Sequence, residues 1–139
     1  MNLIVPAKFI IIDDDSISNL LCRICIKSCF HGSEIATFNF PKEGFSYCSK
    51  NHLNSENSLP HVILLDINMP VWSGWDFLDH FEKLEAGIQN QFKIYIMSSS
   101  IDECDINRAA ENKFVIDYIK KPFTKECLEK IVSDYTSGM

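Results

Sequence analysis

Short apolar runs alternate with segments of helical periodicity along almost the whole chain, and this alternation limits the fold more than any other sequence feature. The apolar runs have the length and the unbroken hydrophobicity of strands that are buried on both faces of a sheet. The segments between them repeat apolar residues at spacings of three and four, as helices with one buried face do. This order predicts a parallel sheet with helices on both sides.

Five strand and helix units can be counted along the chain. The predicted strands are Lys8–Asp13, Ile35–Phe40, Val62–Asp66, Phe92–Met97 and Phe114–Ile119. The predicted helices are 16–30, Lys42–Cys48, Trp75–Leu84, Asp102–Glu111 and Thr124–Tyr135, with Asp102 and Thr124 as N-caps. The second helix is weak and passes into a polar loop, Ser49–Ser58. The predicted fold class is therefore α/β, a five-stranded, doubly wound (βα)5 parallel sheet in three layers.

The length and composition suit one domain. A chain of 139 residues lies within the size range of a single domain. Hydrophobic residues at 46% and charged residues at 23% argue against a disordered chain or a coiled coil. We expect a single, apparently stand-alone domain over residues 1–139, with its core from about 8 to 135. The sequence leaves open whether a further domain has been removed.

Charge and hydropathy narrow the expected partners and location. A net charge of −6 provides no positive field for a phosphate backbone, so direct nucleic acid binding is not expected. The longest strongly apolar stretches, Phe9–Ile12 and Val62–Leu65, are far shorter than the ~20 residues that span a bilayer. The first residues do not resemble a secretory signal. A cytoplasmic protein without membrane contact is expected.

The six cysteines are expected to be reduced, because the chain has its own core and no export signal. Cys22, Cys25 and Cys29 include a CxxC spacing that could indicate a redox pair or a metal site. They also form one helical stripe with Leu21 and Ile26, which favours simple packing in the core. Neither the other cysteines nor the histidines have the spacing of metal ligands.

The informative polar residues follow the predicted strands. In an open parallel sheet, ligands bind beyond the carboxyl ends of the strands. Asp13 and Asp14 follow the first strand, Asp66 the third, Ser98 the fourth and Lys121 the fifth. Neighbouring carboxylates would repel one another in a partly buried pocket, and Mg²⁺ is the divalent ion that suits such oxygen ligands. A carboxylate beside a metal and a lysine is the arrangement expected for an attack on phosphorus.

These segments resemble the CheY-like receiver domains of two-component response regulators. The likeness covers residues 8 to about 135. It rests on four motifs in order along the chain, namely Phe9–Ser16, Val62–Pro70 followed by Gly74, Ile96–Ser98 and Tyr118–Phe123. Each motif is common by itself, whereas the four together at successive strand ends are specific.

The resemblance implies a receiver's chemistry. Asp66 would accept a phosphoryl group from a phosphohistidine of a sensor histidine kinase or a histidine phosphotransfer protein. Mg²⁺ would be held by Asp13, Asp14, Asp66 and the backbone carbonyl of Asn68. Lys121 would bind the phosphoryl oxygens. The downstream protein target is not indicated.

The resemblance also implies a switch. Ser98 would donate a hydrogen bond to the phosphoryl group, and Tyr118 would turn inward behind it and change a protein-binding surface. Pro122 would set the preceding loop through a cis peptide bond. The family's commoner spacing would select Ser99 as the hydroxyl, but Ser98 is preferred because it directly follows the apolar run.

The sequence favours a signalling domain that is not an enzyme over two other functions. Phosphatases of the haloacid dehalogenase type also use an aspartate nucleophile and Mg²⁺, but they need an acid where this chain has Asn68. A nucleotide or flavin module would need a glycine-rich loop after the first strand, where this chain has three acids.

Overall fold

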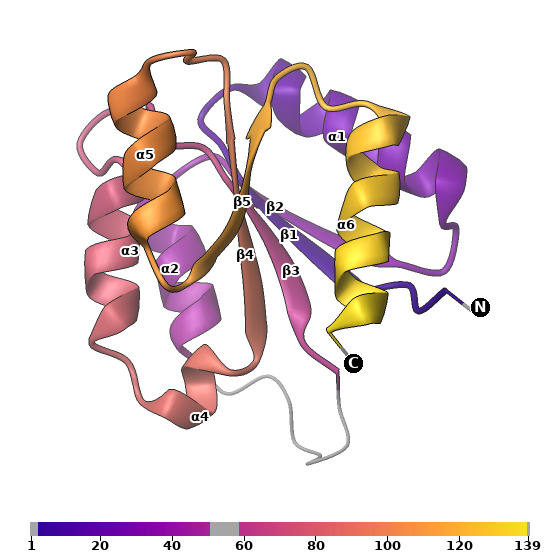
Figure 1. Cartoon of the computed structure of the whole chain (residues 1–139), viewed down its shortest axis with the longest axis horizontal. Coiled ribbons are helices and arrows are strands. Elements are labelled where there is room, and N and C mark those ends of the chain that lie inside the picture. Colours follow the sequence, from indigo (N-terminus) through magenta and orange to yellow (C-terminus); the bar gives the residue numbers. More distant parts are fainter. Residues whose placement is uncertain (1–2, 51–58, 139) are drawn as a thin grey trace.

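The computed structural model describes residues 3–50 and 59–138 and shows a twisted parallel sheet between two layers of helices (Figure 1). The strand order within these residues is β2-β1-β3-β4-β5. The strands are β1 Lys8–Ile12, β2 Glu34–Phe38, β3 His61–Leu65, β4 Phe92–Ser98 and β5 Val115–Lys120. The helices are α1 Ser16–Cys29, α2 Pro41–Ser49, α3 Gly74–Glu82, α4 Ala86–Gln89, α5 Glu103–Glu111 and α6 Lys125–Ser137. The predicted doubly wound α/β fold is confirmed.

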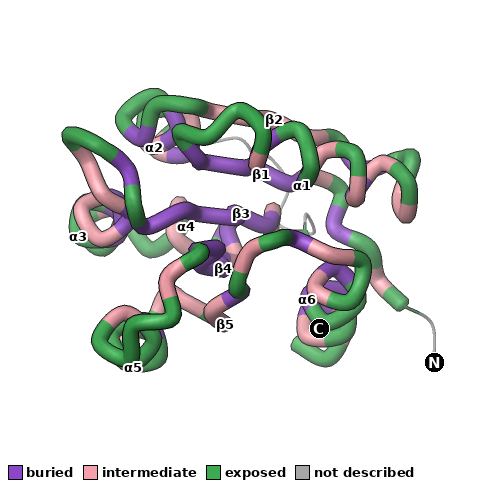
Figure 2. Tube along the Cα trace, turned by 90° about the horizontal axis from the view of Figure 1, so that it is seen from above, coloured by how far each residue is buried: buried purple, intermediate pink, exposed green. Residues whose placement is uncertain are grey.

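The two faces of the sheet bury alternate residues of the same strands. In β1, Phe9 and Ile11 pack with α1 and α6, whereas Ile10 and Ile12 pack in the layer of α2, α3 and α5. All four side chains are fully buried. Figure 2 shows buried residues along the central strands β1 and β3, and exposed residues mainly on the helices and loops. Burial on both faces explains why the strands read as unbroken apolar runs.

Four of the predicted strands extend one or two residues beyond the observed ones, and β5 begins at Val115 instead of Phe114. β1 ends before Asp13 and β3 ends before Asp66, because the backbone turns away from the sheet directly after the apolar run. β2 ends at Phe38, so Phe40 belongs to the loop before α2. Asp13 and Asp66 therefore lie on the loops at the carboxyl edge of the sheet.

The helical predictions hold with small corrections. Asp102 accepts a hydrogen bond from the Cys104 N–H at 2.8 Å, and Thr124 caps α6, so both predicted N-caps are confirmed. The predicted third helix ends at Glu82 instead of Leu84, and the short α4 follows it unpredicted. The predicted loop Ser49–Ser58 lies outside the described residues from position 51 onward.

The cysteine stripe on α1 is largely a packing feature. All six cysteines are free. Cys22 lies in the core beside Ile26, and burial raises the pKa of its thiol to about 12. Leu21, expected on the same stripe, is 48% exposed and therefore faces away from the core. A thiol with a raised pKa is a poor nucleophile and a poor metal ligand.

None of the helices within residues 3–50 and 59–138 combines the length and the apolar character that crossing a bilayer requires.

Candidate functional site

Three carboxylates from two neighbouring strand ends meet at the carboxyl edge of the sheet. β1 and β3 pair in register up to Ile12 and Leu65, which places the next residue of each chain segment side by side. One oxygen from each of Asp13, Asp14 and Asp66 lies within 4.8 Å of the others. Asp13 is fully buried and Asp66 is 4% exposed, whereas Asp14 is exposed. The predicted convergence of the three acids is therefore present.

Lys121, which follows the edge strand β5, reaches two of these acids, Asp13 and Asp66. Its Nζ lies 2.7 Å from Asp13 Oδ2 and 3.7 Å from Asp66 Oδ2. Its backbone N–H donates to the carbonyl of Ser98 at 2.8 Å, which ties the loop after β5 to the end of β4. The Lys121–Pro122 peptide bond is cis, as predicted for Pro122.

Burial and repulsion between the acids dominate the electrostatics of the site. Burial and the neighbouring Asp13 charge raise the pKa of Asp66 to about 7, against the opposing effects of Lys121 and the Asn68 N–H. Burial alone would lower the pKa of Lys121. The hydrogen bond and charge of Asp13 and the charge of Asp66 outweigh it and raise that pKa above its usual value. The site thus holds more negative charge than its lysine neutralises.

The residues present fit a divalent cation. Asp13 Oδ2 is fully buried, and within the described residues its close cationic partner is the Lys121 ammonium at 2.7 Å. Carboxylate oxygens of this kind are the ligands that Mg²⁺ prefers. The Asn68 N–H donates to Asp66 Oδ1 at 3.2 Å, which places Asn68 beside the cluster. Its carbonyl oxygen stays a predicted ligand.

A hydroxyl lies next to the acids. Ser98 is fully buried at the end of β4, and its Oγ accepts from Asn68 Nδ2 at 3.3 Å and from the Ser100 N–H at 3.1 Å. Ser99 is exposed. The Tyr118 hydroxyl donates to the Ser100 carbonyl at 2.8 Å. The geometry favours Ser98 over Ser99 as the hydroxyl of the site, and links Ser98 to Tyr118 through one short loop.

Two residues support the site in roles that were not predicted, although Gly74 was already part of the second sequence motif. Asn19 of α1 is 6% exposed, and its Nδ2 donates to the Asp13 carbonyl at 2.8 Å and to Asn39 Oδ1 at 2.6 Å. Asn19 thereby holds the loop after β1, which carries Asp13, against the loop after β2, which carries Asn39. Its signal in the sequence was a polar residue on the buried side of an amphipathic helix. Gly74 is the other, because a Cβ there would lie 2.5 Å from the backbone oxygen of Asp66.

Comparison with known proteins identifies related chains. The family model of the response regulator receiver domain matches residues 9–133. The chain is 28% identical over 132 residues to the sensor histidine kinase CheAY of Helicobacter pylori, which covers 91% of this chain and 15% of that protein. It is 31% identical over 103 residues to the transcriptional regulatory protein MalR of Bacillus subtilis, with 74% and 41% covered. The chain therefore spans less than half the length of either relative.

Solved structures show the same fold. A two component response regulator from Cytophaga hutchinsonii superposes with a TM-score of 0.83 at 27% identity, covering 96% of this chain and 99% of that one. A response regulator receiver protein from Dyadobacter fermentans gives 0.80 at 23% identity, covering 92% and 96%. The chemotaxis protein CheY4 of Vibrio cholerae gives 0.69 at 21% identity, covering 94% and 99%.

Proposed function

This chain belongs to the response regulator receiver domains of two-component signalling, and on that premise we propose that it accepts a phosphoryl group on Asp66. The observation that carries the proposal is the meeting of Lys121, Asp13 and Asp66 within ion-pair distance at the carboxyl edge of the sheet. A nucleophilic carboxylate with a fixed ammonium beside it suits transfer of a dianionic group.

The proposed donor is a phosphohistidine of a sensor histidine kinase or a histidine phosphotransfer protein in the cytoplasm. An Asp66 carboxylate oxygen forms the new bond to phosphorus, and the bond from phosphorus to the imidazole nitrogen breaks, with its electron pair leaving on the ring. Lys121 attracts the phosphoryl oxygens, and the Ser98 hydroxyl donates a hydrogen bond to one of them. Mg²⁺, held by Asp13, Asp14, Asp66 and the Asn68 carbonyl, would neutralise negative charge on the transferred group.

The proposed output is a change in a protein-binding surface. A dianionic group at Asp66 would draw the Ser98 hydroxyl away from its present partners, Asn68 and the Ser100 N–H. The loop containing Ser100 also holds the Tyr118 hydroxyl, so the ring of Tyr118 would follow. We propose that this movement alters the exposed surface of α5 and β5, where a downstream protein would bind.

Turnover of external substrates is not part of the proposal. The position at which an aspartate-based phosphatase needs a general acid is Asn68, whose amide N–H is far too weak an acid to protonate a leaving group. Its Nδ2 already donates to Ser98. The chain is therefore proposed to transfer a phosphoryl group only to itself, and to lose it slowly.

The proposal is tested by incubating the protein with acetyl phosphate and Mg²⁺ and measuring its intact mass. A phosphoryl adduct is expected in the wild type and in Asp15→Asn, which makes the same chemical change on an exposed neighbour that caps α1. The adduct should be absent from Asp66→Asn and from samples with EDTA. Rapid hydrolysis of a phosphate ester without an adduct would contradict the proposal.

A further inference from the structure

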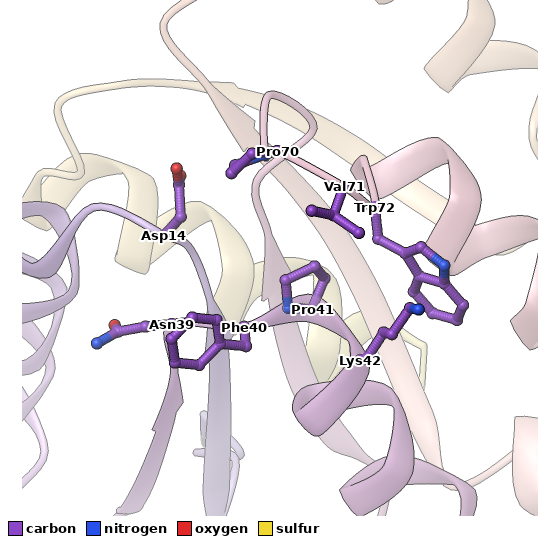
Figure 3. A pocket seen from close by; sticks show the side chains of 8 residues that line it. All are labelled: Asp14, Asn39, Phe40, Pro41, Lys42, Pro70, Val71 and Trp72. Carbon is purple, nitrogen blue, oxygen red and sulfur yellow. The ribbon is translucent and has the colours of Figure 1, made fainter.

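An apolar pocket adjoins the acid cluster. It lies between the β2–α2 loop and the β3–α3 loop and has a volume of about 400 Å³ (Figure 3). Phe40 of the first loop and Pro41 at the start of α2 line it on one side, and Val71 and Trp72 of the second loop line it on the other. Asp14 of the acid cluster also lines it, so the pocket and the proposed phosphoacceptor site share this residue and lie side by side.

Two of the lining residues are apolar and exposed, and each occupies a backbone position that does not suit its side chain. Val71 has φ of 68°, a left-handed conformation that β-branched residues rarely adopt, and its side chain is 91% exposed. Phe40 occupies the N-cap position of α2 without making a capping hydrogen bond, and it is 64% exposed. Neither side chain stabilises the fold in an evident way. Strained or exposed apolar residues gathered at one pocket indicate a binding role.

The side of the pocket formed by Trp72 is held by contacts with neighbouring side chains. The Trp72 ring lies against His80 with centroids 4.3 Å apart and the two planes tilted by 34°, and Lys42 Nζ lies 5.6 Å from the Trp72 centroid. Phe45 packs edge-on against the same indole at 5.6 Å. A ligand would therefore meet an ordered aromatic surface, and little side-chain entropy would be lost when it binds.

We propose that this pocket binds the apolar leaving group of a small acyl phosphate, so that donors with an aromatic acyl group phosphorylate Asp66 faster than acetyl phosphate. The inference rests on the proposed function. With the phosphoryl group at the acids, an acyl group attached to it extends past Asp14 into the pocket. Asp66 forms a bond to phosphorus, the bond from phosphorus to the acyl oxygen breaks, and the acyl group leaves as a carboxylate with the electron pair.

Benzoyl phosphate and acetyl phosphate form a matched pair of donors, because both release a carboxylate and they differ in the ring. The second-order rate constant for adduct formation is measured by intact mass for each donor. The test variants are Val71→Gly, whose new residue adopts the observed φ, and Phe40→Ser, whose new residue suits an N-cap. Leu3→Ser is the control, since Leu3 is 61% exposed and precedes β1 at the opposite edge of the sheet.

The expected result is a benzoyl-to-acetyl rate ratio about tenfold higher in the wild type than in either test variant, as for an added apolar group in a fitted pocket. The control should keep the wild-type ratio. A ratio that is equal in all four proteins, with acetyl phosphate still labelling Asp66, overturns the pocket and leaves the proposed function intact. Failure of both donors overturns the proposed function, and the pocket proposal with it.

Binding can also be measured without metal or phosphoryl transfer. Benzamide carries the same benzoyl group as benzoyl phosphate without the charged phosphate, and acetamide is its matched control. Benzamide should shift the indole N–H signal of Trp72 in a ¹H–¹⁵N spectrum of the wild type, and acetamide should not. The shift should be lost in Val71→Gly. An unchanged Trp72 signal at saturating benzamide would count against the proposal.

Discussion

Lys121 forms its shorter ion pair with Asp13, at 2.7 Å, although the proposed phosphoacceptor Asp66 lies within 3.7 Å of the same ammonium. The reason is burial. Asp13 is the fully buried acid of the cluster, and a carboxylate without water needs a counter-charge more than one with partial access. The lysine therefore has a structural role at this site besides the one proposed in phosphoryl transfer.

Lys121→Met is expected to lower the free energy of unfolding by about 3 kcal/mol at neutral pH, because it leaves the buried Asp13 charge without its partner. It should also slow labelling by acetyl phosphate. Lys120→Met, one residue earlier on an exposed position, should change neither quantity appreciably. Urea unfolding measures the first effect and intact mass the second. Equal stability of the two variants would show that the ion pair contributes nothing.

Metal-free stability should depend on the charge of Asp66. Its pKa of about 7 in the folded chain exceeds the ordinary value of 3.8, so the folded chain binds the proton more tightly than the unfolded chain. This group therefore destabilises the fold progressively as pH rises from about 4 to about 7, and fully above that range. Asp66→Asn should be more stable than the wild type by about 2 kcal/mol at pH 8 and nearly equal at pH 4. Urea titrations in EDTA test this, and a difference that does not vary with pH would contradict it.

Mg²⁺ should stabilise the folded chain, because the folded state holds three acids together and the unfolded chain does not. At a concentration about a hundred times its dissociation constant, one bound ion adds about 2.7 kcal/mol. The rise in Tm should be present in Asp15→Asn and strongly reduced in Asp14→Asn, which removes charge from the exposed member of the cluster. Equal shifts in the two variants would place the ion elsewhere.

Gly74 and Gly87 should respond oppositely to alanine. A Cβ at Gly74 would lie 2.5 Å from the Asp66 carbonyl oxygen and 2.8 Å from Ile67 Cα, so backbone must move and about 2 kcal/mol of stability should be lost. A Cβ at Gly87 in α4 meets nothing within 4 Å, and alanine there should gain up to about 1 kcal/mol. Urea unfolding distinguishes these outcomes. Only Gly74→Ala should also slow labelling of Asp66.

Ser98→Ala should lower the rate of adduct formation from acetyl phosphate by about tenfold, since a hydrogen bond to a charged oxygen contributes about 1.5 kcal/mol or more. Ser99→Ala, on an exposed position, should react at the wild-type rate. The reverse order of effects would assign the hydroxyl of the site to Ser99.

Most of the secondary structure could be predicted from the sequence, because buried strands and helices each place apolar residues at a characteristic spacing along the chain. Strands buried on both faces read as apolar runs such as Val62–Leu65, and the N-caps at Asp102 and Thr124 follow from side-chain chemistry alone. The four-residue helix Ala86–Gln89 was not predicted, because it buries no residue and its sequence therefore shows no apolar periodicity. The strand ends at Asp13 and Asp66 were displaced by one residue because acids at a strand end give no sign of where the backbone turns.

By itself, the sequence determined the order of the five strands and of the main helices, through the spacing of their apolar residues. It also determined which acids, hydroxyl and lysine gather at the site, because parallel strands bring their carboxyl ends to one edge of the sheet. The tertiary structure alone decided which atoms meet. It paired Lys121 with Asp13 more closely than with Asp66, and it brought Phe40 and Val71 from two separate loops to one pocket. Contacts between loops depend on distances across the folded sheet, and no local pattern of residues encodes them.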